Sequence, residues 1–277
     1  MFMKKFLFLI FVVLAVAAAV WFYYFKIKKL VPVNTIIVSG NIEATETRLS
    51  FQVAGKINKL LVDEGDYVKK GKVVATLDDN ELMKVKQQAQ ASYEQAQSDF
   101  NLSEKDYTRY KQLFEENAIS VQDWDVAQNK FQVAKAKVES AKNAFEVAGI
   151  RLDYANLVSN AQGFVTVKSA ETSEVVQPGS TVFTIVDMND IWLTAYIMET
   201  DLGKIRLNQE VDVKTDSYPN KIYKGRISFI SQESEFTPKY IQTPEERVKL
   251  VYRIKIDVSN TNFELKPGMP ADGYIKE

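Results

Sequence analysis

The sequence of 277 residues contains no cysteine and no histidine. Without them the chain can have no thiol nucleophile, no disulfide bond and no histidine-based catalytic triad, and most kinds of zinc site are excluded. A lipid anchor on an N-terminal cysteine is excluded as well. The absence of cysteine is compatible with an oxidising compartment, in which an unpaired thiol is a liability.

An excess of charge of either sign is also missing. The 35 basic and 36 acidic residues give a net charge of −1, and no long basic run occurs. Nucleic-acid-binding proteins carry a basic patch or stripe, so we expect no nucleic-acid partner. The phosphate-binding sequence G-x-x-x-x-G-K-[ST] does not occur either. Any energy for the activity must therefore come from a partner.

Residues 6–25, FLFLIFVVLAVAAAVWFYYF, contain no charged residue. A helix of this length spans roughly 30 Å, the thickness of the hydrocarbon core of a bilayer. Lysines flank both sides, and Trp21, Tyr23 and Tyr24 gather at the far end, where amphipathic rings favour the membrane interface. The alternative is a cleaved signal peptide, whose apolar core is usually about 7–15 residues long. Small residues occur at Ala17–Ala19, but the aromatic run continues through them, so we expect an uncleaved anchor. Because the tail before the segment is very short, we expect a cytoplasmic N-terminus and an exported body.

Proline is absent between residues 79 and 153, and Gly149 is the one glycine there. The segment is rich in alanine, glutamine, lysine and glutamate, which are good or fair helix formers. Its apolar residues recur at alternating spacings of three and four, the pattern that specifies a coiled-coil seam. The predicted seam positions are Leu82, Lys86, Ala89, Tyr93, Ala96, Phe100, Ser103, Tyr107, Tyr110, Phe114, Trp124, Ala127, Phe131, Ala134, Val138, Ala141, Phe145, Ala148 and Leu152.

The seam pattern breaks at residues 115–120, EENAIS, which predicts a two-helix hairpin with its turn there. A helix over residues 79–114 would be a rod of roughly 54 Å, too long to bury itself in a globule of this size. The functional interpretation is that the hairpin projects from the rest of the chain and brings its tip to a distant partner. The alternatives are an ordinary surface hairpin and a dimerisation coil.

A repeat links the segments on either side of the predicted hairpin. Residues 53–77 align without a gap with residues 161–185 at an offset of 108. Alternating valine and isoleucine supply one buried face in each copy. Glycines, which suit tight turns and close backbone approach, occur at Gly55, Gly65, Gly71, Gly163 and Gly179. Each copy resembles half of a lipoyl or biotinyl domain, so we expect the two halves to form one β-sandwich with the hairpin inserted between them.

The first copy is followed by a Met83–Lys84 pair, like the modified site of biotin carriers. In a carrier domain that lysine sits on the tight turn between the two halves. Lys84 falls instead inside the predicted helix, and the second half follows only after the hairpin. We therefore interpret Lys84 as a solvated lysine on a helix. The alternative is a biotinyl or lipoyl carrier subunit that is modified at Lys84.

The order of N-terminal anchor, half lipoyl motif, α-helical hairpin, half lipoyl motif and further β-structure resembles the hemolysin-D-like membrane fusion proteins. These proteins are the periplasmic adaptors of tripartite efflux and secretion systems, and the resemblance covers nearly the whole chain. It implies a mainly β fold with a long coiled-coil hairpin, a split lipoyl-like β-sandwich and a β-barrel domain. The implied domains are residues 1–30 for the membrane anchor, 31–50 for the first membrane-proximal or barrel strands, 51–78 for the first half-motif, 79–154 for the hairpin, 155–187 for the second half-motif and 188–277 for the barrel with the C-terminal strand.

The resemblance extends to the hairpin tip. Adaptors that dock TolC-like outer-membrane channels carry an arginine, a leucine four residues later and a serine seven residues beyond that. RYKQLFEENAIS places Arg109, Leu113 and Ser120 at those spacings. The arginine can hydrogen-bond carbonyls and carboxylates at a channel mouth, the leucine offers an apolar anchor, and the serine can cap the second helix. The alternative is that Arg109 is only solvated, Leu113 only packs the turn and Ser120 only caps.

The last part of the chain resembles the β-barrel domain of the same family. Trp192 is expected to open a strand, residues 199–201 to start a short helix, and residues 265–275 to form the closing turn and last strand. Residues 243–258, TPEERVKLVYRIKIDV, are similar to adaptors that serve ATP-binding-cassette exporters. One departure is SNAQG at residues 159–163, where adaptors often have Ala-Pro-x-Asp-Gly.

The resemblance implies a non-catalytic adaptor without cofactor or metal. It would sit in the inner membrane of a Gram-negative bacterium by a single span, with its bulk in the periplasm. It would assemble as a ring, with six copies suggested by adaptor rings, between an inner-membrane transporter of the ATP-binding-cassette type and a TolC-like channel. The alternatives are the carrier subunit and a membrane-anchored coiled-coil scaffold. The transported substrate cannot be read from the sequence.

Overall fold

The computed structural model of the chain describes residues 35–236 and 250–276. The chain divides into two compact units, with unit 2 formed by residues 46–187 and unit 1 by the residues on either side of it. The predicted anchor at residues 6–25 lies outside the described residues. Neither of the long helices in the described part is apolar enough to cross a membrane.

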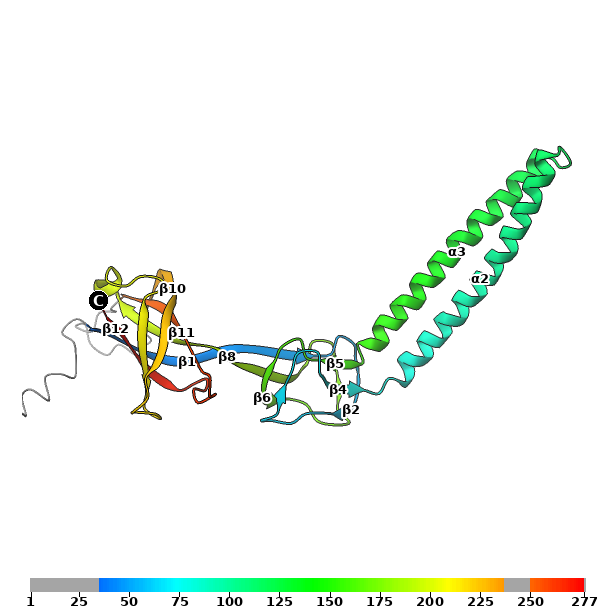
Figure 1. Ribbon diagram of the computed structural model, residues 1–277. Coiled ribbons are helices and arrows are strands. Elements are labelled where there is room, and N and C mark those ends of the chain that lie inside the picture. Colours follow the sequence, from blue (N-terminus) through cyan, green and yellow to red (C-terminus); the bar gives the residue numbers. More distant parts are fainter. Residues whose placement is uncertain (1–34, 237–249, 277) are drawn as a thin grey trace, which may run out of the picture. The chain divides into compact units, whose positions relative to one another are not determined.

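Unit 1 is built around a closed set of six β-strands, at the left of Figure 1. Their order around the barrel is β1, β12, β9, β10, β11 and β8, and a pairing of β1 with β8 closes it. The strands are β1 (Thr35–Ser50), β8 (Thr181–Met198), β9 (Glu210–Thr215), β10 (Tyr223–Phe236), β11 (Leu250–Val258) and β12 (Pro270–Lys276), and the short helix α4 (Glu199–Leu202) follows β8. Alternate valine and isoleucine side chains of these strands fill one core, as the period of a strand requires.

Strand β8 is longer than the sequence indicated, because Trp192 does not open a strand but lies well inside β8. Strand β1 continues without a break through Gly40. The glycine allows close approach of the two strands: a Cβ at Gly40 would lie 1.8 Å from the carbonyl oxygen of Thr194 on β8.

The two predicted repeat copies are interleaved in the β-part of unit 2. Its strands are β2 (Gly55–Leu60), β3 (Tyr67–Val68), β4 (Val73–Leu77), β5 (Asn156–Val158), β6 (Gly163–Lys168) and β7 (Val175–Val176). Strand β2 of the first copy pairs with β7 of the second, and β3 of the first pairs with β6 of the second. Side chains from both copies share one hydrophobic core. The prediction that the copies form one β-unit is confirmed.

Hydrogen bonds between the copies are reciprocal, which shows an internal two-fold relation. The backbone N–H of Gly65 donates to the carbonyl of Val165 at 2.8 Å. Ser173, the equivalent of Gly65 at the offset of 108, donates to the carbonyl of Ile57, the equivalent of Val165, at 2.9 Å. A second reciprocal pair is formed by Gly71 with Ser159 (2.7 Å) and Gly179 with Phe51 (3.0 Å).

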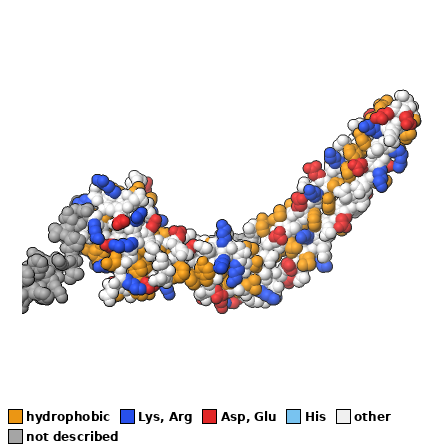
Figure 2. Space-filling model, in the orientation of Figure 1, with side chains coloured by type: hydrophobic (Ala, Val, Ile, Leu, Met, Phe, Trp, Pro, Cys, Tyr) orange, Lys and Arg blue, Asp and Glu red, His pale blue; other side chains and the backbone are white. Residues whose placement is uncertain are grey.

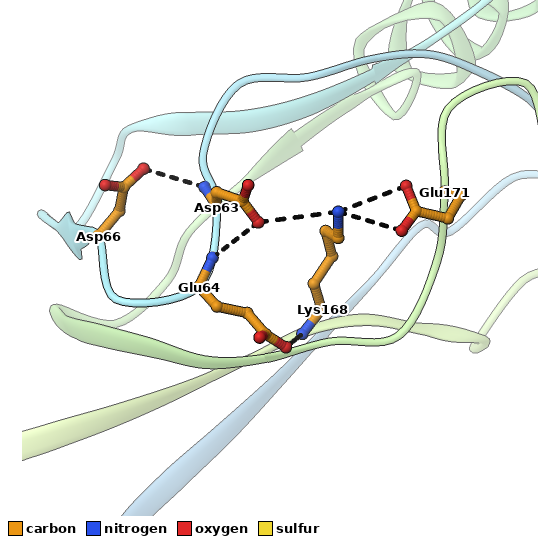
Figure 3. A network of polar contacts seen from close by, with 5 residues as sticks. All are labelled: Asp63, Glu64, Asp66, Lys168 and Glu171. Carbon is orange, nitrogen blue, oxygen red and sulfur yellow. Dashed lines mark hydrogen bonds and ion pairs between the residues drawn. The ribbon is translucent and has the colours of Figure 1, made fainter.

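A polar network ties one loop of each copy together (Figure 3). The Nζ of Lys168 lies 3.0 Å from a carboxylate oxygen of Glu171 and 3.7 Å from one of Asp63, and the backbone N–H of Lys168 donates to Glu64. Asp63 and Glu171 are themselves equivalent positions of the repeat. The hydrogen bond to Glu171 and the nearby charge of Asp63 raise the pKa of Lys168, so this lysine stays charged between the two loops.

One position of the repeat departs from its partner in a testable way. Ser173 has φ 74°, and its equivalent Gly65 has φ 90°. A left-handed residue with a Cβ is strained by about 1–2 kcal/mol, part of which glycine recovers. We expect Ser173→Gly to raise the free energy of unfolding of unit 2 by about 0.5–1 kcal/mol. Urea unfolding curves measure this change, and the matched Gly65→Ser variant should lower stability by a similar amount. A neutral result for both variants would refute the strain.

The inserted hairpin consists of α2 (Asn80–Glu115) and α3 (Val121–Asp153), drawn in cyan and green in Figure 1. All predicted seam positions are buried or half-buried. The deeply buried ones are alanines, Ala127, Ala134 and Ala148. Lys86 also lies in the seam, and its stem passes Gly149, where a Cβ would be 3.9 Å from Cε. The 3-4 spacing therefore predicted both the helices and the face by which they pack.

Aromatic rings bridge the two helices along the seam. Tyr93 stacks with Phe145 at 6.3 Å between ring centroids, and Phe131 contacts both Phe100 (5.5 Å) and Tyr107 (4.7 Å). Two further contacts near the tip join Trp124 to Tyr107 (5.2 Å) and to Phe114 (5.7 Å). The aromatic partners advance along α2 from Tyr93 to Phe114 as they recede along α3 from Phe145 to Trp124, always in multiples of seven residues, so the two helices are antiparallel in one register.

Candidate functional site

The candidate site is the tip of the hairpin, where residues 116–120 join α2 to α3. Helix α2 ends in a Schellman arrangement: Ala118 donates its N–H to the carbonyl of Leu113 (2.8 Å), and Asn117 donates to that of Phe114 (3.0 Å). Asn117 has φ 56°, the left-handed conformation that this motif needs and that asparagine tolerates better than most residues. The carbonyls at the end of α2 are thus satisfied within a very short turn.

Ser120 is the N-cap of α3. Its backbone is extended, with φ −77° and ψ 156°, and its Oγ accepts a hydrogen bond from the N–H of Asp123 at 3.1 Å. The same hydroxyl donates to a carboxylate oxygen of Asp123 at 2.6 Å. Asp123 also places a negative charge in the first turn of α3, where the helix dipole favours it. The capping role of Ser120 that the sequence allowed is therefore present.

Arg109 and Leu113 lie one helical turn apart on the last part of α2. The side chain of Arg109 is 67% exposed and forms an ion pair with Asp106 at 3.3 Å. An exposed pair of this kind contributes little to stability, so the guanidinium is available to a partner. Leu113 is half-buried. Within the described residues no hydrogen bond or ion pair joins the side chains of Arg109, Leu113 and Ser120, so the three form a surface rather than a preassembled network.

Two features of the tip were not anticipated from the sequence. Asn117 sets the turn by its positive φ, and the asparagine in EENAIS could have indicated a left-handed helix end. Val121, directly after the cap, exposes 62% of its surface. An exposed apolar residue on the first turn of α3 extends the apolar part of the tip beyond Leu113.

The glycines of the repeat divide into two kinds. Gly65, Gly71 and Gly179 have φ between 86° and 90° and lie in turns. Gly55 and Gly163 are not turn residues, since each is the first residue of a strand. A Cβ at Gly163 would lie 2.2 Å from the carbonyl oxygen of Val186, whereas one at Gly55 would only touch the Leu77 side chain at 3.0 Å.

Lys84 lies in the second turn of α2, exposed, with its Nζ 3.3 Å from the side-chain oxygen of Gln87. No tight β-turn presents it, because β4 leads directly into the helix. Among residues 35–236 and 250–276, no cluster of acidic side chains has the arrangement of a metal site.

Two family models match the chain, and together they cover the hairpin and the barrel. Residues 85–155 match the model described as "RND MFP, alpha-helical hairpin domain", and residues 191–272 match the "YknX-like beta-barrel domain". The chain is a membrane fusion protein. Membrane fusion proteins are structural adaptors, so this one is not an enzyme.

The chain is also similar to curated relatives and to solved structures. The "UPF0194 membrane protein" of Citrobacter koseri is 28% identical over 86% of this chain and 87% of its own, and that of Yersinia enterocolitica is 28% identical over 94% of both. The fold is similar to the membrane fusion protein Spr0693 from Streptococcus pneumoniae (TM-score 0.66, 20% identity, 87% of this chain and 100% of that one). It is also similar to MacA from Actinobacillus actinomycetemcomitans (TM-score 0.63, 22% identity, 88% and 78%).

Proposed function

We propose that this membrane fusion protein is a periplasmic adaptor that links an inner-membrane transporter to a TolC-like outer-membrane channel. The observation that carries the proposal is the long hairpin with an exposed tip, inserted between two halves of one β-unit that we equate with a split lipoyl domain. Residues 6–25 would anchor the chain in the inner membrane, and copies of it would form a ring, six in number, around a conduit.

The hairpin is suited to holding its tip at a distance from the β-unit rather than to catalysis. Its 36-residue and 33-residue helices correspond to rods of roughly 54 Å and 50 Å. Aromatic pairs at constant register brace the rods from Tyr93 to the tip. A rod that is braced along its length can hold Arg109, Leu113 and Ser120 far from the β-unit, where a partner at a distance would meet them.

The inner-membrane partner is proposed to be a transporter of the ATP-binding-cassette type. This proposal rests on the sequence pattern of residues 243–258, of which the described part forms β11 of the barrel. Purification of the full-length protein after mild solubilisation, followed by identification of the co-purified transporter, tests it. A proton-driven transporter in that complex would overturn this choice of partner while leaving the adaptor function intact.

The tip assignment predicts the effect of reversing one charge. Arg109→Asp should reduce capture of the outer-membrane channel by about tenfold, because it replaces a donor to carbonyls and carboxylates with an acceptor that repels carboxylates. The measurement is cross-linking in native membranes followed by purification of the adaptor. Capture of the inner-membrane transporter and the amount of protein in the membrane should not change.

Lys111→Asp is the matched control. Lys111 is exposed on the same helix two residues away, on a different face, and the substitution changes the net charge equally. Its channel capture should stay within about twofold of the unmodified protein. Equal losses in both variants would mean that the tip acts only through its overall charge, and equal retention would remove Arg109 from the site.

A further inference from the structure

The barrel of unit 1 has one end at which strand β1 begins, called here the entry rim. At this rim Thr35 pairs with Lys276, the last residue of β12. The side chain of Gln209, in the loop between α4 and β9, donates to the backbone carbonyl of Lys276 at 2.8 Å. Neighbouring strands of the barrel are antiparallel, so β8 ends and β11 begins at the same rim, where Met198 pairs with Val251.

Large apolar side chains are exposed at the entry rim. Ile37 is the third residue of β1, Met198 the last of β8 and Leu250 the first of β11, and Leu207 lies in the loop before β9. They expose 53%, 48%, 38% and 58% of their surface, in that order, and are called here the rim cluster. Exposed apolar residues that four separate segments bring to one rim mark a surface that contacts another molecule.

Ile37 and Met198 lie side by side on the outer wall of the barrel. The side chain of Trp192 on β8 donates a hydrogen bond to that of Glu43 on β1 at 3.1 Å. Continuing this antiparallel register by six residues toward the rim places Ile37 opposite Met198. The residues next to them in their strands belong to the core, so both side chains point outward.

Tyrosines and basic residues lie beside and behind the rim cluster on the same wall. Tyr274 of β12 pairs with Ile37, and the Nζ of Lys214 lies 4.9 Å from the centre of the tyrosine ring. Tyr196, farther from the rim on β8, is 40% exposed and pairs with Arg253. Figure 2 shows hydrophobic side chains among basic ones on unit 1, at its left. At a membrane interface, tyrosine rings and the charged ends of lysine and arginine lie in this way at the level of the headgroups, beside apolar side chains that enter the lipid.

The charges of α4 and of the loop after it are balanced. They belong to Glu199, Asp201, Lys204 and Arg206. Lys204 forms an ion pair with Asp201 at 2.7 Å, and Lys276 at the end of β12 forms one with Asp212 at 3.0 Å. This part of the rim therefore offers no excess of positive charge to anionic headgroups. A contact with a bilayer has to come from the apolar side chains.

The chain limits the distance between the predicted anchor and the entry rim. Nine residues, 26–34, separate Phe25 from Thr35. Fully extended, they span at most about 36 Å, so the anchor keeps the entry rim within that distance of the bilayer. The tether gives the rim cluster a high effective concentration at the membrane surface. Ile222, which is also exposed, lies directly before β10 at the opposite rim, at the far end of the strands.

We infer that the entry rim rests on the inner membrane, with the rim cluster in the interfacial layer of the phospholipids and Tyr196 and Tyr274 at the headgroups. This inference rests on the anchor of the proposed function and adds a second contact with the same bilayer. The contact is apolar, so it needs no anionic lipid. It holds the barrel against the membrane, whereas a tether alone leaves the barrel free to turn.

Lipid quenching tests the contact in the full-length protein, because a single cysteine can be labelled in a chain that has none. Leu207→Cys and Ile222→Cys carry the same fluorophore in bilayer nanodiscs without transporter, and lipids brominated near the headgroup end of their acyl chains quench it. The two sites are exposed to a similar degree, 58% and 53%, at opposite rims. Quenching should be at least about threefold stronger for Leu207→Cys, since interfacial side chains lie about 5–10 Å into the boundary of the bilayer. Equal quenching at the two sites would overturn the inference.

Lipid charge gives a second readout. Quenching of Leu207→Cys should be the same in phosphatidylcholine and in its mixture with phosphatidylglycerol, because the rim has no excess of positive charge. Quenching that requires phosphatidylglycerol would overturn the apolar contact. A label at Leu207→Cys that is shielded only after the transporter is added would also overturn it, and would assign the rim cluster to a protein partner.

Charge insertion shows whether the rim cluster acts as a unit. Met198→Glu should reduce the quenching of a label at Leu207→Cys at least about threefold, whereas Ile222→Glu, at the opposite rim, should leave it unchanged. Equal circular dichroism would show that both variants fold. Equal quenching in both would mean that Met198 does not enter the lipid, against the inference.

Extraction with alkaline carbonate separates this inference from the anchor. Protein that resists extraction but shows no quenching at Leu207→Cys would refute the rim contact and leave the anchor intact. Protein that is extracted would refute the anchor. In that case, quenching of Leu207→Cys on mixing with phosphatidylcholine vesicles would still support the rim contact, and its absence would refute it.

Discussion

Gly40→Ala is expected to lower the free energy of unfolding of unit 1 by about 3 kcal/mol, the upper part of the range for overpacking a core. The added Cβ would lie 1.8 Å from the carbonyl oxygen of Thr194 and 2.9 Å from the Cα of Ala195. Both atoms belong to the backbone of β8, so no side-chain rotation can relieve the clash. Strands β1 and β8, whose pairing closes the barrel, must separate.

Hydrogen exchange measures this effect in each unit separately. The amides of β1 and β8 in unit 1 should exchange about 100-fold faster in Gly40→Ala, because each 1.4 kcal/mol corresponds to a factor of ten. Gly203→Ala is the control in the same unit, since no atom lies within 4 Å of its Cβ position and its φ is −69°. That variant should exchange as the unmodified protein does. Equal rates in both variants would mean that β1 and β8 do not approach as the structure shows.

The role of Gly40 in the barrel could not be predicted from the sequence around it. A glycine in a β-like run is equally compatible with a strand end and with close backbone approach. Which applies depends on β8, which enters the barrel about 150 residues later in the chain. The same holds for Trp192: the strand containing it starts at Thr181, in the second repeat copy, and no local signal marks its continuation across the boundary of the two units.

The hairpin and the repeat were predictable because their signals are local or periodic. The 3-4 spacing named the seam residues, and the offset of 108 named equivalent positions such as Gly65 and Ser173. The repeat did not reveal that Ser173 keeps the left-handed backbone of its glycine counterpart. That conformation is imposed by the reciprocal hydrogen bonds between the copies, which override the preference of serine.

The tip was predicted less completely. The spacing of Arg109, Leu113 and Ser120 indicated a surface, and the structure gives Ser120 a definite local role as the N-cap of α3. The exposure of Val121 and the turn set by Asn117 depend on how α2 ends, which the seam pattern does not contain. The docking role of these residues stays a prediction that the Arg109→Asp comparison tests.

Phe131→Ala is the second substitution with a large expected effect, and it acts on the rod rather than on its tip. Phe131 contacts both Phe100 and Tyr107, so alanine removes two steps of the aromatic series at once. Replacing a fully buried phenylalanine costs about 3–5 kcal/mol; for this half-buried ring we expect about 2 kcal/mol. Because each part of a two-helix rod is held only by its neighbours across the seam, the loss should open the segment between Phe131 and the tip, and not the barrel.

Hydrogen exchange should therefore accelerate about 30-fold for residues 100–131 in Phe131→Ala, with unchanged rates in unit 1. Gln132→Ala, next in the chain but exposed, is the matched control and should leave all rates unchanged. Channel capture should also fall in Phe131→Ala, although Arg109, Leu113 and Ser120 are intact, because a frayed rod no longer holds them in place. Undiminished capture with a frayed rod would mean that the tip residues act without the rigidity of the hairpin, and the reach interpretation would fail.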